Sequence, residues 1–179
     1  FTLQRLGFDV LQVHTVLFSN HTGYGLFRGQ IMSAEHIRDI LAGLKDRGVL
    51  HKVGAVLSGY LGNADTGAVI LDAVNDIRHA NPGLRYLCDP VMGDVGRGLF
   101  VNPAIPDFLR DQAIPFANII TPNQFEFELL TGSRLTSVAE AVAVARQMRG
   151  RGPDTIIITS LATPDIPADQ LGTLAVNGQ

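Results

Sequence analysis

Short apolar runs and amphipathic segments alternate along most of the chain, separated by Gly-, Asn- or Asp-rich stretches. The apolar runs predict strands at residues 8–14, 53–59, 84–89, 117–121 and 154–160, with a last strand entering a turn at 174–179. Apolar residues at helical spacing predict helices at residues 33–48, 63–80, 102–115, 123–132 and 137–152. Strands that alternate with helices favour a parallel sheet covered on both faces. We therefore predict an α/β fold of three layers, α/β/α, with a mainly parallel central sheet.

The two ends of the chain interrupt this pattern. The first ten residues are typical of the end of a helix that runs into a strand, and the chain starts with Phe1 instead of Met. The 179 residues suit a single domain with a substantial core. We expect residues 1–179 to form one domain that is incomplete at both ends.

Composition narrows the classes of protein to consider. Hydrophobic residues make up 46% of the chain and charged residues 17%, which is typical of a folded, soluble protein. The single cysteine, Cys88, excludes an internal disulfide and suits a reducing compartment. The apolar runs are too short to span a bilayer, and no secretion signal is visible. A net charge of −3 without a Lys/Arg-rich run argues against nucleic acid. We expect a cytoplasmic protein with neither a nucleic-acid nor a membrane partner.

Polar, Gly-rich loops follow five of the predicted strands, whereas the opposite strand ends are ordinary helix-to-strand turns. In open α/β sheets, ligands bind beyond the carboxyl ends of the strands. The five loops begin at residues 15, 58, 89, 121 and 159. We therefore expect the functional site at this edge of the sheet.

The stretch "CDPVMGDVGRG" carries two carboxylates, Asp89 and Asp94, on one short loop. Two carboxylates this close repel each other unless a cation or hydrogen-bond donors compensate them, and Mg²⁺ typically takes one or two carboxylates together with phosphates and water. The loop's glycines would let the backbone approach a phosphate. Alternatively, Asp89 caps a turn before Pro90 and Asp94 is solvated. The pair together with its glycines favours the ion.

Two further strand ends carry candidate phosphate ligands. In "TPNQFEFELLTG", Asn123 and Glu126 have the spacing of a capping box, and residues of these types at a helix N-terminus can also orient a metal-bound water or a phosphate. Thr159 and Ser160 follow a buried strand and could donate hydroxyl groups to a phosphate, although hydroxyl groups are common at strand ends.

The stretch "FSNHTGYG" mixes aromatic, hydroxyl and amide side chains, a combination that suits a flat, hydrogen-bonding ring. Tyr60, in "SGYLG", occupies a similar position after another strand and could pack against a ring or cover the core. The chain has no Walker A pattern, dinucleotide-binding glycine fingerprint or nucleophile elbow. These absences argue against a P-loop nucleotide hydrolase.

Five motifs in order, "FSNHTGYG", "SGYLG", "CDPVMGD", "ITPNQFEFELLTG" and "GPDTIIITS", closely resemble pyridoxal kinases of the ribokinase-like superfamily. "DPVMGD" and "TPN" are shared with hydroxymethylpyrimidine kinases, whereas "FSNHTGY" is specific to pyridoxal kinases. The resemblance implies transfer of the ATP γ-phosphoryl group to the 5′-hydroxyl of pyridoxal, pyridoxine or pyridoxamine in vitamin B6 salvage. It implies a pyridoxal site lined by Thr22 and Tyr60, with Phe18 and His21 nearby.

The same resemblance implies ATP and Mg²⁺ as cofactors, leaves the use of a monovalent cation open, and implies a homodimer. The ATP-binding residues expected from it are Asp89, Asn123, Glu126, Thr159 and Ser160. The metal-binding residues expected from it are Asp89, Asp94, Thr121 and Glu126.

The chain departs from these kinases at both ends. Nothing in it matches the Gly-rich Gly-Asp segment that supplies their anion hole and catalytic base, which we expect beyond Gln179, or their first strand, which we expect ahead of Phe1. We therefore expect the isolated 179-residue chain to be inactive and assign no catalytic base within it. Two alternatives are a hydroxymethylpyrimidine kinase-like enzyme and a protein that binds B6 vitamers or nucleotide without turnover.

Overall fold

The computed structural model describes residues 2–178, and its centre is a five-stranded sheet with strand order β3-β4-β7-β8-β9. Strands β3, β4, β7 and β8 are parallel, and β9 is antiparallel to β8. The strands are β3 (Ala55–Ser58), β4 (Arg85–Cys88), β7 (Ile119–Ile120), β8 (Thr155–Leu161) and β9 (Gly172–Val176). The predicted α/β class with a mainly parallel central sheet is confirmed.

Helices connect the strands close to where the apolar spacing predicts them. They are α1 (Thr2–Arg5), α2 (Ala34–Asp46), α3 (Ala64–Ala80), α4 (Ile105–Phe108), α5 (Ile114–Phe116), α6 (Gln124–Thr131) and α7 (Val138–Arg149). A π-helical segment, η3 (Leu109–Ala113), joins α4 to α5, and η1 (Thr22–Tyr24) and η2 (Leu50–Lys52) are 3₁₀ turns.

Local capping sets several of the helix ends. The side chains of Ser33, Asn63 and Ser137 each accept a hydrogen bond from the backbone amide three residues on, which fixes the starts of α2, α3 and α7. Gly132 ends α6 in the left-handed conformation, with φ 70°, which glycine adopts without a steric penalty.

Helices α3 to α7 pack on one face of the sheet. Alternate strand residues on this face are fully buried, namely Tyr86, Cys88, Ile120, Ile156 and Ile158. They form one core cluster with residues of α3, α4, α6 and α7. On the opposite face Leu57 lies beside Leu87 in the strand register, and its side chain is 61% exposed. Among residues 2–178, helices therefore cover mainly one of the two faces.

The predicted strand at residues 8–14 is wrong, because this segment is irregular and forms no part of the sheet. Its apolar residues fit a strand, but Phe8 and Leu11 remain 61% and 54% exposed. A strand is stabilised by pairing with a neighbour, which local apolar spacing does not supply. The loop that was expected to follow this strand belongs instead to an antiparallel hairpin of β1 (Val16–Phe18) and β2 (Gly29–Ile31).

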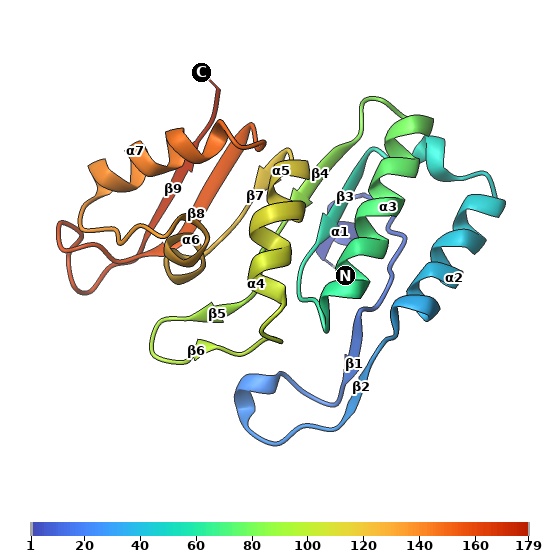
Figure 1. The fold of residues 1–179 in the computed structure, drawn as a ribbon, viewed down its shortest axis with the longest axis horizontal. Helices are drawn as coiled ribbons and strands as arrows, with labels where there is room; N and C mark the ends of the chain where they lie inside the picture. Colours follow the sequence, from blue (N-terminus) through green and yellow to red (C-terminus); the bar gives the residue numbers. More distant parts are fainter. Residues whose placement is uncertain (1, 179) are drawn as a thin grey trace.

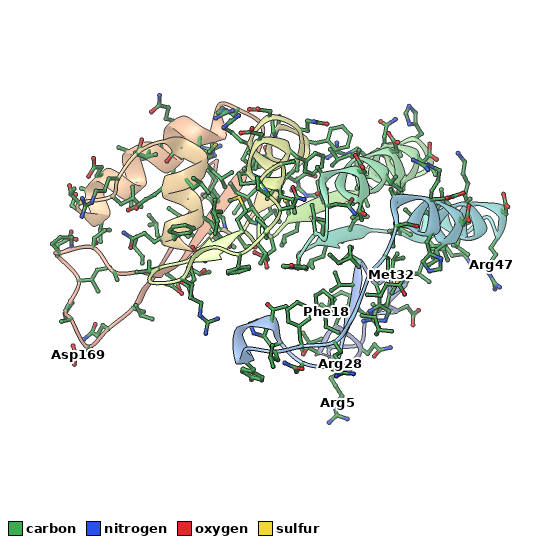
Figure 2. The ribbon with its side chains drawn as sticks, turned by 60° about the horizontal axis from the view of Figure 1, so that its bottom comes forward. Arg5, Phe18, Arg28, Met32, Arg47 and Asp169 are labelled. Carbon is green, nitrogen blue, oxygen red and sulfur yellow. The ribbon has the colours of Figure 1, made fainter. Side chains whose placement is uncertain are left out.

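A second hairpin, of β5 (Gly93–Asp94) and β6 (Gly98–Leu99), follows β4 and was also not predicted. Both hairpins project from the edge of the molecule where β3 and β4 end, which is the lower edge in Figure 1. Figure 2 shows the β1–β2 hairpin, with Phe18 and Arg28 labelled, lying on the opposite side of the sheet from the main helices. The loops with candidate chemistry therefore gather at the carboxyl edge of the sheet.

Candidate functional site at the carboxyl edge of the sheet

Asp89 follows β4 directly and is anchored at the centre of this edge. Its backbone amide donates to the Ser58 carbonyl at the end of β3, 2.9 Å away. The side chain of Thr121, at the end of β7, hydrogen-bonds to its carboxylate. Burial raises the pKa of the Asp89 carboxyl, and the Thr121 hydrogen bond lowers it in part. Asp89 is thus a half-buried anion between two strand ends, where a bound cation would stabilise its charge.

The capping box of α6 is present as the sequence predicts. The Asn123 side chain accepts from the Glu126 amide at 2.9 Å, and Glu126 Oε2 accepts from the Asn123 amide at 2.9 Å. Both side chains also reach the base of the β5–β6 hairpin. Glu126 Oε1 accepts from the amides of Met92 at 2.9 Å and Gly93 at 3.5 Å, and Asn123 Nδ2 donates to the Gly93 carbonyl at 2.9 Å. Helix α6 therefore holds the base of the hairpin.

Glu126 is a buried carboxylate whose charge is held mainly by backbone amides. Its side chain is 4% exposed, and burial raises its pKa, while the amides of Asn123, Met92 and Gly93 lower it and the charge of Asp89 raises it further. Both of its oxygens already accept hydrogen bonds. Glu126 is therefore placed to support the hairpin and to add negative charge beneath Asp89.

The hairpin base is also packed too tightly for any side chain at Gly93. A Cβ atom there would lie 2.4 Å from Cε1 of Phe125 and 2.5 Å from the Gly98 carbonyl oxygen. Glycine is required at this position by close approach, because its φ is not in the left-handed region. Gly93 thus serves the close packing of the hairpin against Gly98 and α6, and the approach of the loop's glycines to a phosphate stays a prediction.

Asp94 lies one residue further along the hairpin and is exposed. Its Oδ1 accepts from the Val95 amide at 2.7 Å, so its side chain closes the hairpin turn. Within residues 2–178, no group of three or more His, Cys, Asp or Glu side chains is arranged to hold a metal ion. Mg²⁺ needs only one or two carboxylates when phosphates and water complete its shell. The Asp89 carboxylate and Thr121 hydroxyl offer the oxygen donors that this ion prefers.

Thr159 and Ser160 lie beside the start of α6. The Thr159 amide donates to the Pro122 carbonyl at 2.9 Å, and Thr159 forms an isolated parallel bridge with Asn123. Ser160 has φ 52°, the only left-handed non-glycine residue in the described chain, at an irregularity in the β8–β9 pairing. Strained residues of this kind are concentrated at functional sites. The structure therefore brings Asp89, Thr121, Asn123, Glu126 and Thr159 into one connected group.

The β1–β2 hairpin carries the aromatic candidates. The rings of Phe18 and Phe27 lie 4.7 Å apart, and those of His21 and Tyr24 lie 5.7 Å apart. The half-buried Thr22 begins the 3₁₀ turn η1 between the strands. Three of the four predicted ring-binding residues therefore belong to one hairpin.

Ser19 and Asn20, to which the sequence analysis assigned no individual role, hold this loop closed. Asn20 donates from Nδ2 to the carbonyls of His21 and Leu26, and Ser19 Oγ donates to Asn20 Oδ1 and accepts from the Arg28 amide. Ser and Asn commonly bond to nearby backbone in turns. The presence of Ser19 and Asn20 next to each other could therefore have indicated a turn held by side-chain hydrogen bonds.

Tyr60, the fourth ring candidate, lies on the loop after β3 and is half-buried. Its carbonyl accepts a hydrogen bond from Thr15 Oγ1 at 2.7 Å, which connects the loop to the base of the β1–β2 hairpin. No sequence motif singled out Thr15. The two halves of the predicted ring site are thus joined by a residue outside every motif.

A buried polar pair lies beneath the site. Ser58 Oγ and the Tyr86 hydroxyl are 2.8 Å apart, and burial raises the pKa of the tyrosine well above its ordinary value. Burial also raises the pKa of the neighbouring Cys88 thiol to about 11. Cys88 therefore remains a protonated thiol at neutral pH, which makes it a packing residue and a poor nucleophile.

Comparison with solved structures identifies the fold. A pyridoxal kinase of Leishmania donovani in complex with ADP and pyridoxamine superposes with a TM-score of 0.85 and 34% identity, over 92% of this chain and 56% of that one. A pyridoxal kinase of Entamoeba histolytica with PLP superposes with a TM-score of 0.81 and 27% identity, over 87% and 56%. The fold and its polar carboxyl edge define a protein of the ribokinase-like class.

Sequence comparison gives the family. The family model described as phosphomethylpyrimidine kinase matches residues 2–173, and the chain belongs to this family. Its relatives include the pyridoxal kinase PdxY of Deinococcus radiodurans, 51% identical over 183 residues, and that of Corynebacterium diphtheriae, 48% identical over 182 residues. These alignments include all of this chain but only 61% and 63% of the relatives. No helix within residues 2–178 is both long and apolar enough to cross a membrane.

Proposed function

We propose that this chain is part of an ATP-dependent kinase that phosphorylates the 5′-hydroxyl of pyridoxal, and also of pyridoxine and pyridoxamine. The observation that carries the proposal is the connected group at the carboxyl edge, in which Asp89 and Thr121 lie beside the start of α6. It is supported by similarity to pyridoxal kinases along the whole chain. The "FSNHTGYG" loop favours a pyridoxal ring over a pyrimidine.

Phosphoryl transfer depends on positioning the reactants and neutralising charge, with little covalent chemistry for the protein. In this proposal Asp89, with Thr121, holds Mg²⁺, which when bound neutralises charge on the ATP phosphates. Asp94 contributes to the cation shell from the hairpin. Thr159 and Ser160 donate hydrogen bonds to the phosphates.

The two side chains at the start of α6 support this cradle. Asn123 and Glu126 fix the α6 N-terminus, whose free amides favour an anion. Glu126 acts on the metal through its charge and through the hairpin that it holds. Residues 2–178 therefore have positioning and charge-neutralising roles, and we assign no catalytic base among them.

The vitamer ring occupies the other half of the site. In the proposal Thr22 and Tyr60 line it, and Phe18 and His21 contribute from the same hairpin loop as Thr22. A half-buried hydroxyl and aromatic rings can hydrogen-bond and stack on a pyridine ring. We further propose that the protein is a cytoplasmic homodimer.

The activity is tested on the full-length protein after its mass has been measured. A mass well above the 19.2 kDa of this chain should accompany phosphorylation of pyridoxal with ATP and Mg²⁺. Hydroxymethylpyrimidine is offered in competition, because the matching family model is described as phosphomethylpyrimidine kinase. Preference for the pyrimidine would replace the pyridoxal assignment, and binding without turnover by the longer protein would refute the kinase.

Replacing Thr22 by Ala should raise the KM for pyridoxal while leaving the KM for ATP nearly unchanged. Loss of one hydrogen bond to the ring corresponds to roughly three- to tenfold. Steady-state kinetics with each substrate varied in turn measures both constants. If the KM for ATP rises instead, the assignments of the two pockets are reversed.

A further inference from the structure

The two parts of the proposed ring site come from distant segments of the chain. Phe18, His21 and Thr22 lie on the β1–β2 hairpin, and Tyr60 lies on the loop that follows β3. Residues so far apart in sequence can line one site only if specific contacts hold the two segments next to each other. The structure shows two such contacts, and neither involves a predicted ring-binding side chain of the hairpin.

The first contact is a hydrogen bond. Thr15 Oγ1 donates to the Tyr60 carbonyl at 2.7 Å, between half-buried residues 45 positions apart. The Thr15 carbonyl in turn accepts from the Met32 amide at 3.0 Å, which closes the base of the hairpin. Through its side chain and its backbone, Thr15 therefore connects the hairpin base to the Tyr60 loop.

The second contact is steric and involves the other hairpin strand. Ile31, the last residue of β2, packs against Gly62, and a Cβ atom at Gly62 would lie 2.1 Å from Ile31 Cγ2. Gly62 does not have a positive φ, so a side chain here would be limited only by Ile31, whose side chain would have to shift. The hairpin thus contacts the loop of residues 60–62 through both of its strands.

Much of the hairpin is exposed, although Val16 and Phe18 of β1 are partly buried. All three residues of β2 are exposed, and the Leu17 side chain of β1 is 61% exposed. A two-stranded ribbon is only marginally stable by itself. The contacts of Thr15 and Ile31 therefore decide where the loop of Phe18 and Thr22 lies relative to Tyr60.

We propose that Thr15 is a positioning residue for vitamer binding, which sets the distance between the hairpin loop and Tyr60 without touching the substrate. The inference rests on the proposed function, because it takes these two segments to line the ring site. The group of Asp89, Thr121 and Glu126 is held by separate hydrogen bonds. Thr15 therefore acts on the pyridoxal side of the reaction alone.

The test compares Thr15→Val with Thr15→Ser in the full-length protein. Valine keeps the shape of threonine but removes the donor, which leaves the Tyr60 carbonyl without this partner, whereas serine keeps the hydroxyl. Thr15→Val should raise the KM for pyridoxal about three- to tenfold, the range for loss of one hydrogen bond. The kcat and the KM for ATP should stay at wild-type values, and Thr15→Ser should restore the KM for pyridoxal.

The steric contact supplies a second, independent test. Gly62→Ala should raise the KM for pyridoxal in the same way, and adding Ile31→Ala to Gly62→Ala should recover part of the loss, because the double variant makes room for the new methyl group. Wild-type constants for Thr15→Val, equal effects on both substrates, or no rescue by serine would each overturn the inference.

A readout that does not depend on turnover separates this inference from the proposed activity. Hydrogen exchange of the peptide at residues 16–31 should be faster in Thr15→Val than in wild type and unchanged in Thr15→Ser. If wild-type protein does not phosphorylate pyridoxal, the proposed function fails. Faster exchange in Thr15→Val would then still support the attachment, and unchanged exchange would overturn it.

Discussion

Replacing Asp89 by Asn should lower the kcat of the full-length protein by more than about tenfold, because in the proposed site the half-buried carboxylate supplies charge to the metal and phosphates. Asparagine has the same shape and can still accept the hydrogen bond of Thr121. Steady-state kinetics with saturating ATP and Mg²⁺ measures the loss. Unchanged kinetics would remove Asp89 from the site.

The same substitution should leave the protein as stable as wild type or slightly more stable. Burial raises the pKa of Asp89, so the folded chain binds a proton more readily than the unfolded chain. The stabilising contribution of this group is therefore present below the unfolded pKa and is lost as pH rises through the folded pKa. At neutral pH the charge is a cost that Asn removes, and thermal unfolding of Asp89→Asn at pH 7 measures it. A large fall in Tm would mean that the activity loss reports unfolding.

A matched control is Asp76→Asn on helix α3. Asp76 forms an exposed ion pair with Lys45 at 2.6 Å, near the end of α3 that lies far from the carboxyl edge. Exposed pairs contribute about 0–1 kcal/mol. This variant should keep wild-type kcat and lose little stability.

The second large effect is expected for Glu126→Ala, which should lower the free energy of unfolding by about 3 kcal/mol. Hydrogen bonds to a buried charged group are strong, and their loss leaves backbone amides without partners. The amides of Met92 and Asn123 lose their carboxylate partner at once. Because the hairpin base is then released, kcat should also fall. Chemical denaturation and steady-state kinetics measure the two effects.

Glu140→Ala provides the matched control, because Glu140 occupies the corresponding position in the first turn of α7, three residues after the N-cap Ser137. Its carboxylate accepts hydrogen bonds from the amide and the hydroxyl of Thr136 on the surface. Within residues 2–178, these hydrogen bonds connect it to no other element. This variant should cost less than about 1 kcal/mol and leave kcat unchanged. Equal destabilisation by the two variants would mean that the hairpin contacts of Glu126 contribute nothing.

Much of the central fold could be predicted from the sequence, because its signals are local. The capping box of Asn123 and Glu126, the N-cap Ser33 and the stop at Gly132 all depend on neighbouring residues. The buried strand at Thr155–Leu161 is a nearly continuous apolar run. In each case the residues that determine the local structure lie within the element itself or next to it.

The parts that could not be predicted depend on partners distant in sequence. Residues 8–14 have strand-like spacing but no paired neighbour, and Gly93 packs against the Phe125 ring, 32 residues away, as well as against the Gly98 carbonyl. The strand-end pattern predicted that the loops starting at Asp89 and Thr121 meet at one edge of the sheet, and they do, whereas Thr15 could not be singled out because its hydrogen bond spans 45 residues. The roles of Asp89, Thr121 and all the other site residues stay predictions.

The β1–β2 hairpin has an evolutionary consequence. The proposed phosphate half of the site is built from loops that follow the adjacent strands β4, β7 and β8, so replacing this half as a unit would mean replacing parts of the central sheet. The proposed ring half lies largely on residues 15–32, one contiguous stretch that contacts the loop of residues 60–62 through Thr15 and Ile31. In the proposed kinase, exchange of that stretch by recombination could redirect the enzyme to a different ring while its phosphate chemistry is inherited intact.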